Sequence, residues 1–178
     1  MFTVLYIIGG LIVLVLLLHL MGPKNYDVFR TVEISRPKNE VFTYLTSLKN
    51  MDDWSPWAKR DPNMEKKFTG TDGQVGAVSY WNGNKEVGEG EQEIKKIIDG
   101  ERIESELRFL KPFKSTSDCY IDVEALANGH TEVKWGFTGT NKFPMTIMSL
   151  FKNMDSMVGP DFEQGMASLK TVMENNNK

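Results

Sequence analysis

The first 22 residues, Met1 to Gly22, contain no Asp, Glu, Lys or Arg, and the run from Phe2 to Met21 is almost entirely apolar. A helix rises about 1.5 Å per residue, so about 20 apolar residues match the roughly 30 Å hydrocarbon core of a bilayer. We therefore predict that residues 1–22 are a transmembrane anchor, which contacts the membrane through residues 2–21.

A cleaved signal peptide is the competing interpretation of this segment. Such a peptide has a positively charged leader, a shorter apolar run and a cleavage site of small residues, and the sequence offers none of these. We expect an uncleaved, single-pass anchor instead. Lys24 and Arg30 follow it, with Asp27 between them, and these two positive charges favour a cytoplasmic position for the rest of the chain.

About 155 residues follow the anchor, which is the size of one ordinary domain. All 21 basic and 24 acidic residues lie in this part and give a net charge of −3. No run of Lys or Arg is long enough to follow a phosphate backbone, so nucleic acid is not a predicted partner. The only cysteine, Cys119, excludes an internal disulfide and a cysteine-rich zinc site.

Tight-turn signals and alternating segments predict a sheet of about seven strands. Asp99-Gly100 and Asn128-Gly129 supply the positive φ angles that hairpins need. Between such turns the apolar residues alternate with polar ones, as in a strand with one buried face. The predicted strands are residues 26–34, 65–69, 75–81, 87–98, 102–109, 116–126 and 132–137. Most are expected to be joined as consecutive antiparallel hairpins, which gives a curved meander.

Helices are expected at two places. Pro37 can occupy a first helical turn, and the apolar residues from Val41 to Leu48 then fall on one stripe. A long amphipathic helix is predicted from Ile147 to Met173, with a break or kink at Pro160. This order of elements predicts an α+β domain whose antiparallel sheet wraps around the C-terminal helix.

Three segments carry a resemblance to a known superfamily: Val32–Leu45 (VEISRPKNEVFTYL), Trp54–Trp57 (WSPW) and Gly159–Lys170 (GPDFEQGMASLK). They resemble the START-like (SRPBCC) helix-grip superfamily, which includes START domains, plant pathogenesis-related proteins and bacterial polyketide cyclase-like proteins. The resemblance covers residues 26–175. It implies a START-like ligand-binding domain with an apolar cavity between the sheet and the C-terminal helix, and members bind lipids, sterols or polyketides, while a minority catalyse reactions there.

The large apolar residues of the domain are the candidate pocket. Aromatic residues are spread over the strands, and methionines, which adapt to varied apolar partners, are concentrated in the last helix. Core filling is the simpler explanation for any one of them. Gly165 has two explanations as well, close packing against the sheet or room for a ligand, and close packing is preferred. The predicted ligand-binding residues are Trp57, Tyr80, Phe109, Trp135, Phe151, Phe162 and Met166.

The residues that catalysis usually needs are missing. His19 lies in the anchor and His130 in a predicted turn, so neither is placed as a general base inside a pocket. Cys119 is expected to be a small buried residue. Glu89, Glu91 and Glu93 share one strand face and are expected to be a solvated outer face, with Gly90, Gln92 and Ile94 facing inward. No catalytic residue, metal or cofactor is predicted.

The sequence therefore predicts a membrane-anchored domain that binds a hydrophobic small molecule or lipid without covalent chemistry. A polyketide cyclase-like or hydrolase-like enzyme on the same fold is one alternative. A partner-binding structural domain with a filled core is another. An enclosed volume of about 300 Å³ or more between sheet and helix would favour the binding function.

Overall fold

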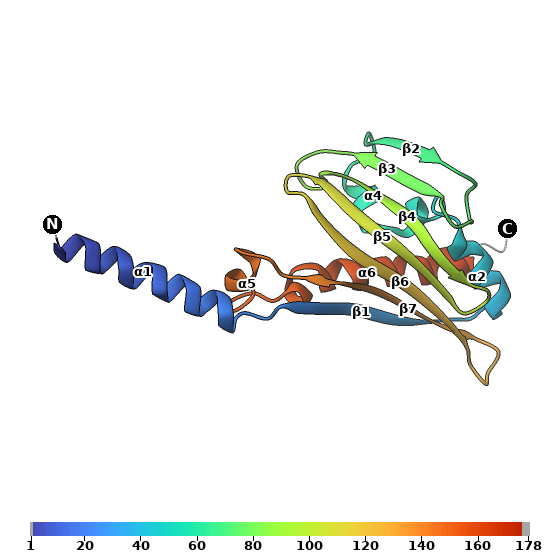
Figure 1. Cartoon of the computed structure of the whole chain (residues 1–178). Helices are drawn as coiled ribbons and strands as arrows, with labels where there is room; N and C mark the ends of the chain where they lie inside the picture. Colours follow the sequence, from blue (N-terminus) through green and yellow to red (C-terminus); the bar gives the residue numbers. More distant parts are fainter. Residues whose placement is uncertain (1, 176–178) are drawn as a thin grey trace.

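The computed structural model describes residues 2–175. Its first element, helix α1 (Phe2–Met21), extends away from the rest of the chain, and none of its residues is buried (Figure 1). Its mean hydropathy reaches 2.7, so α1 is long and apolar enough to cross a membrane. A short connector, Gly22–Lys24, joins it to the domain.

The domain is built on one antiparallel sheet with the strand order β1-β7-β6-β5-β4-β3-β2. Strands β2 to β7 form a meander, and β1 pairs with β7, so the first strand lies beside the last. The predicted α+β class and the antiparallel meander are confirmed. The strands are β1 (Asn25–Ile34), β2 (Glu65–Thr69), β3 (Val78–Asn82), β4 (Glu89–Ile98), β5 (Arg102–Lys111), β6 (Ser115–Ala125) and β7 (Thr131–Thr140).

Three short helices lie between β1 and β2: α2 (Lys38–Thr46), α3 (Met51–Trp54) and α4 (Pro56–Arg60). Helix α2 begins after Pro37, whose φ of −63° suits the start of a helix, and it buries an apolar stripe against the sheet. Pro56 is the first residue of α4, so the chain turns at Ser55 and presents Trp54 and Trp57 to the inner face of the sheet.

The C-terminal segment forms two helices, α5 (Met145–Met148) and α6 (Met154–Asn175). The sequence predicted one helix from Ile147 with a break at Pro160. The position of the break is wrong, because the helices are interrupted between Met148 and Met154. Asn153 starts the second helix, because its side-chain oxygen accepts a hydrogen bond from the Ser156 backbone N–H at 2.8 Å, as an N-cap residue does. Pro160 lies inside α6 near its start.

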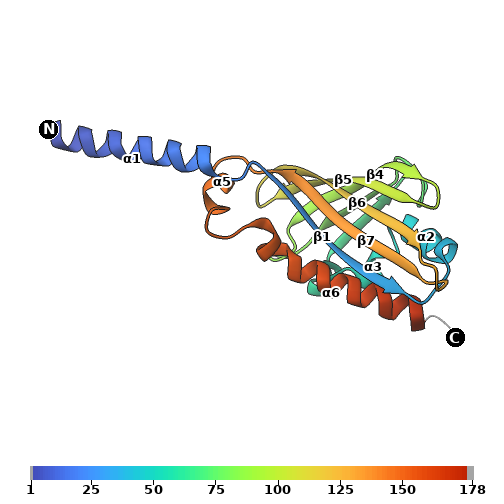
Figure 2. The same ribbon diagram turned by 90° about the horizontal axis from the view of Figure 1, so that it is seen from below.

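Helix α6 lies beside the edge strand β1 (Figure 2). Arg30 on β1 bonds two carboxylates of the helix, Asp155 and Glu163, each at 2.8 Å. At the other end of the helix, Arg36 donates to the backbone carbonyls of Met173 and Glu174, at 3.0 and 3.2 Å. A cation at the last carbonyls of a helix also complements the helix dipole, so both ends of α6 are fastened to the β1 region.

Candidate functional site

Aromatic side chains form a continuous row across the inner face of the sheet and onto α6. Neighbouring ring centroids in the row lie 5.8 to 6.5 Å apart, at distances typical of favourable aromatic pairs, except for one stacked pair at 4.1 Å. We call this set the aromatic row: Trp81, Phe109, Phe137, Phe162, Trp135 and Trp57.

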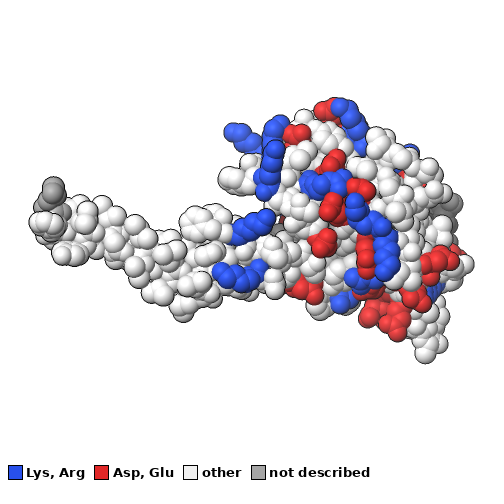
Figure 3. Space-filling view, viewed as in Figure 1, with Lys and Arg blue, Asp and Glu red and all other residues white. Residues whose placement is uncertain are grey.

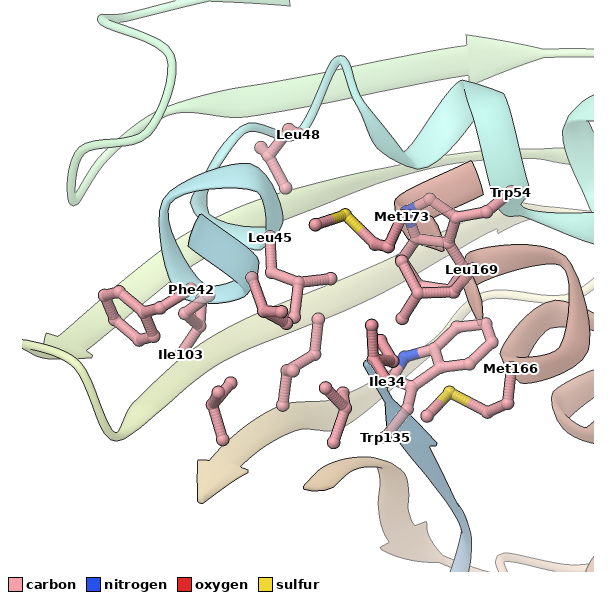
Figure 4. Close-up of a cluster of buried hydrophobic side chains, with 14 of the residues drawn as sticks. Ile34, Phe42, Leu45, Leu48, Trp54, Ile103, Trp135, Met166, Leu169 and Met173 are labelled. Carbon is pink, nitrogen blue, oxygen red and sulfur yellow. The ribbon is translucent and has the colours of Figure 1, made fainter. Parts of the chain in front are cut away.

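The centre of the aromatic row is tightly packed. Trp135 stacks on Phe162 with a centroid distance of 4.1 Å, and Trp54 meets Trp135 edge-on at 4.8 Å. A Cβ added at Gly165 would lie 2.7 Å from Cζ3 of Trp135, so the absence of a side chain there is what lets α6 approach the ring. This favours close packing over ligand space for Gly165. Figure 4 shows Trp54 and Trp135 among the apolar side chains of α6.

Burial along the inner face decreases from one end of the domain to the other. At the end near α2 the inner residues are sealed, with Ile34, Val133 and Leu169 fully buried. At the end near α1, Phe109 packs against the core and Trp81 meets its ring edge-on at 6.3 Å, yet both are only half-buried. The aromatic row is therefore closed at its centre and more accessible at its two ends, and the end formed by Trp81 and Phe109 lies on the side of the domain that faces α1.

Polar groups lie beside the aromatic row on the same face of the sheet. Gln92 on β4, Ser105 on β5 and Ser117 on β6 are all buried. The hydroxyls of Ser117 and Tyr26 are 2.8 Å apart, and burial raises the pKa of Tyr26. A mostly apolar surface with a few convergent polar groups is typical of small-molecule sites.

The cavity next to Trp135 is far smaller than a ligand pocket. A cavity bounded by Leu45 and Leu48 of the helical insert and by Gln92 and Trp135 of the sheet measures about 10 Å³. That volume holds at most about one water molecule, whereas ligand pockets measure roughly 300 Å³ or more. At this place the packed side chains leave no room for a ligand, so a ligand could enter only if they moved.

A larger hollow of about 510 Å³ lies on the opposite, outer face of the sheet. Charged side chains line it, and Arg102 lies over the Tyr120 ring at 4.3 Å while pairing with Glu104 and Asp122. Because this hollow is open and charged, it does not suit an apolar ligand.

The structure brings together five of the seven predicted ligand-binding residues. The inner cluster contains Trp57, Phe109, Trp135, Phe162 and Met166. Their proximity does not test a binding function, which stays a prediction.

The other two predicted residues lie elsewhere. Tyr80 is on the outer face of β3, where its hydroxyl donates to Glu89 at 2.9 Å. Phe151 lies between α5 and α6 with 82% of its surface exposed. The inward residue of β3 is instead Trp81, whose partner Gly90 leaves room for the indole.

The predicted inner and outer faces of β4 are confirmed. Gly90, Gln92 and Ile94 are buried, while Glu91 and Glu93 face outward and bond Arg108 at 2.6 and 2.7 Å. Within residues 2–175, no group of three or more His, Cys, Asp and Glu side chains is arranged to hold a metal ion.

The three candidate acid–base or nucleophilic side chains lie apart from one another. His19 contacts Thr146 at 2.6 Å at the end of α1, and His130 contacts Glu33 at 2.6 Å in the β6–β7 turn. Cys119 is buried, as predicted, and burial raises its thiol pKa to about 12. A thiol with that pKa is almost entirely protonated near neutral pH, so it is a poor nucleophile.

Solved structures share this architecture at low sequence identity. A protein from Nitrosospira multiformis matches with a TM-score of 0.61 and 14% identity, over 84% of this chain and 97% of that one. The protein XoxI from Bacillus cereus matches with a TM-score of 0.61 and 15% identity, over 85% and 98%. Ginseng major latex-like protein 151 from Panax ginseng matches with a TM-score of 0.60 and 12% identity, over 85% and 99%. These similarities establish the helix-grip fold.

No curated protein matches the sequence significantly. The family model described as "Polyketide cyclase / dehydrase and lipid transport" matches residues 27–174, which is nearly all of the chain beyond the apolar helix. With its helix-grip sheet and C-terminal helix, the chain belongs to the polyketide cyclase / dehydrase and lipid transport family.

Proposed function

We propose that this protein is a membrane-anchored domain that binds a hydrophobic small molecule or lipid along the aromatic row, without covalent chemistry. The observation that carries the proposal is the open end of the row. Half-buried Trp81 and Phe109 lie at the end of the domain where α1 joins it, so a ligand leaving a bilayer that α1 crosses would meet this end first. The family description, which includes lipid transport, supports the same function.

Binding requires the interior to open, because the cavity next to Trp135 measures only about 10 Å³. Helix α4 is the element best placed to move. Trp57 in α4 is half-buried and meets Trp135 and Phe162 edge-on at 5.8 and 6.0 Å. An ion pair between Arg60 and Asp161 at the surface holds α4 to α6. Surface ion pairs contribute about 1 kcal/mol or less, so this attachment resists opening only weakly.

The hydrophobic effect is large enough to drive such an opening. A ligand that buries about 300 Å² of apolar surface gains about 7 kcal/mol at about 25 cal/mol per Å². Part of that gain is lost in displacing Trp57 and ordering the ligand, and the remainder is the affinity. We also propose that the domain lies on the cytoplasmic side. Lys24, three residues after the end of α1, is the positive charge that favours this side, since the charge of Arg30 is already paired with two carboxylates of α6.

The test is to purify the full-length chain in detergent, extract it with organic solvent and identify retained molecules by mass spectrometry. A Phe109→Asp variant introduces a charge on the open part of the aromatic row and should lose the retained molecule. Phe29→Asp is the matched control, since Phe29 is also a strand phenylalanine but lies exposed on the outer face. Both variants should keep the wild-type circular dichroism spectrum.

The two alternatives give different results in the same experiment. A folded wild-type protein that retains nothing, even after incubation with lipid extract, would support a partner-binding domain, which the filled interior favours. An enzyme would instead turn over a candidate substrate. Replacement of a polar inner residue such as Gln92 should then abolish this turnover and leave binding of the substrate unchanged.

A further inference from the structure

Exposed apolar side chains are concentrated at one end of the domain. Outside α1, eight large hydrophobic residues are exposed in the part of the chain that the structure describes, and only Phe29 and Val75 lie elsewhere. The remaining six are Phe113, Phe143, Met148, Leu150, Phe151 and Met157. They belong to the tip of the β5–β6 hairpin, to the region around α5 and to the start of α6, which all lie at the end facing α1 (Figure 1). Scattered exposed apolar residues are normal, but such a cluster marks an interaction surface.

The junction between α1 and the domain is a packed contact. The side chain of Asn141 donates to the carbonyl of Pro23 at 3.0 Å, and its backbone N–H donates to the carbonyl of Lys24 at 2.7 Å. Gly22 is buried against Thr146, because an added Cβ would lie 2.0 Å from the Thr146 carbonyl oxygen. The position of α5 relative to α1 is therefore fixed.

This junction sets the depth of α5 relative to the membrane. His19, in the last turn of α1, contacts Thr146 of α5 at 2.6 Å and meets the ring of Phe143 edge-on at 5.9 Å. The last turn of a helix of about 20 residues lies at the boundary between acyl chains and headgroups when the helix spans a bilayer. Helix α5 then lies at the same boundary.

Residues 142–152 have the composition of a segment that lies in this boundary. Lys142 and Lys152 flank it, and its exposed residues are apolar, while Thr146 and Ser149 turn inward and are buried. Apolar and aromatic side chains bracketed by lysines suit the interface, because the rings enter the acyl region and the ammonium groups reach the headgroups.

Charge is distributed in the same way. The connector and the segments between strands at this end, residues 22–24, 61–64, 83–88, 112–114 and 141–153, hold five lysines and two acidic residues, which is a net charge of +3. The rest of the chain holds 16 basic and 22 acidic residues, which is −6. In Figure 3 the charged side chains at the edge of the domain that faces α1 are mostly basic, whereas basic and acidic side chains are mixed over the rest of this face. A basic surface next to a membrane attracts anionic lipid headgroups.

We propose that residues 142–152 and the hairpin tip Lys111–Lys114 form a peripheral docking surface for anionic lipid headgroups of the bilayer that α1 crosses. The proposal rests on the membrane anchoring in the proposed function. Phe113, 82% exposed between two lysines at the tip, is a second contact away from the α1 junction. Two contacts beside α1 fix the domain on the lipid surface, and they turn the open end of the aromatic row toward the bilayer.

The test uses the full-length chain in vesicles, with Cys119→Ala as background and one new cysteine labelled with a fluorophore. Lipids carrying a nitroxide near the headgroup quench only a label that touches the bilayer surface. Labels at Phe113→Cys and Phe151→Cys should be quenched in vesicles of equal parts phosphatidylcholine and phosphatidylglycerol. Val75→Cys is the matched control, since Val75 is also exposed but lies in the β2–β3 loop at the other end, and its label should not be quenched.

The lipid charge separates headgroup binding from simple proximity. Each lysine near an anionic surface contributes about fivefold to the ratio of docked to undocked domain. Lys114→Gln should therefore reduce the quenching of the label at position 113 in the mixed vesicles. In vesicles of phosphatidylcholine alone, this label should be quenched only weakly even without Lys114→Gln. No quenching at position 113, or quenching that is equal in both lipids and unchanged by Lys114→Gln, would overturn the proposal.

A failure of the docking proposal can be distinguished from a failure of the proposed ligand binding. Ligand retention is measured in detergent and does not depend on docking. Release of the chain from vesicles by an alkaline wash would show that α1 does not span, and would overturn both the anchoring and the docking.

Discussion

Gly165→Ala is the substitution that best tests how the interior is packed. In an ordinary helix this change stabilises a protein by about 0.5 to 1 kcal/mol, because alanine loses less conformational freedom on folding. Here the added methyl group would lie 2.7 Å from Cζ3 of Trp135 and 3.3 Å from Cδ of Pro56. Trp135 has little room to retreat, since Phe162 stacks on it at 4.1 Å and Trp54 meets it at 4.8 Å.

The packing cost should exceed the helix gain. Overpacking a well-filled core costs about 1 to 3 kcal/mol, and the upper part of this range, about 2 to 3 kcal/mol, applies where the ring cannot retreat. After subtraction of the helix gain, the net loss in the free energy of unfolding is about 1 to 2 kcal/mol. For a domain of this size the melting temperature should fall by about 2 to 8 °C. Trp135→Phe removes the ring atom that the methyl group meets. In the Trp135→Phe protein, Gly165→Ala should therefore lower the free energy of unfolding less than it does in the wild type, by about 1 kcal/mol or more. A double-mutant cycle measures this difference.

Thermal unfolding of the four proteins in detergent, followed by near-ultraviolet circular dichroism, measures this coupling. Gln164→Ala is the control, because Gln164 is an exposed neighbour in the same helix. The packing argument is wrong if Gly165→Ala raises the melting temperature. It is also wrong if Gly165→Ala lowers the stability of the wild type and of the Trp135→Phe protein by the same amount. The ring would then have space to move into, which is what a ligand-accepting interior needs.

Two further predictions concern ionisable groups. The pKa of about 12 for the buried Cys119 thiol leaves about one part in a hundred thousand as thiolate at neutral pH, so a maleimide should label it only after unfolding. Rapid labelling of the native protein would contradict this. The hydrogen bond from Arg30 lowers the pKa of Asp155 below its usual 3.8, so the pair stabilises the fold above 3.8 and that stability is lost as the pH falls through the lowered pKa. Urea unfolding should therefore show wild type more stable than Asp155→Asn near neutral pH, with the difference vanishing in acid; a constant difference would refute it.

The strands could be predicted from the sequence because each has one buried face. The alternation of Val133, Trp135 and Phe137 with polar neighbours is confirmed by their burial, and the predicted ends differ from the observed ones by at most three residues. The helical insert was also predicted, on the apolar stripe after Pro37. The pairing of β1 with β7 was not, because nothing local in either strand specifies a partner so far away in sequence.

The candidate site could be predicted only in part, for two physical reasons. Tyr80 and Trp81 are adjacent aromatics, so one must face outward, and only the pairing of Trp81 with Gly90 decides which. Phe151 fits the helical apolar stripe, but the Asn153 cap starts a new helix after it and leaves it exposed. The volume inside depends on how the rings stack, and spacing along the chain does not encode that.

The connector Gly22–Lys24 joins α1 to the sheet without a flexible linker. Pro23 has a fixed φ, Gly22 is pressed against Thr146, and β1 begins at Asn25, so α1 and the sheet are expected to move together. A helix of about 30 Å that crosses a thinner bilayer tilts, and in a thicker one it stands upright. In the proposed anchoring, the angle of the sheet to the lipid surface would follow that tilt, so the thickness of the membrane would set the orientation of the domain.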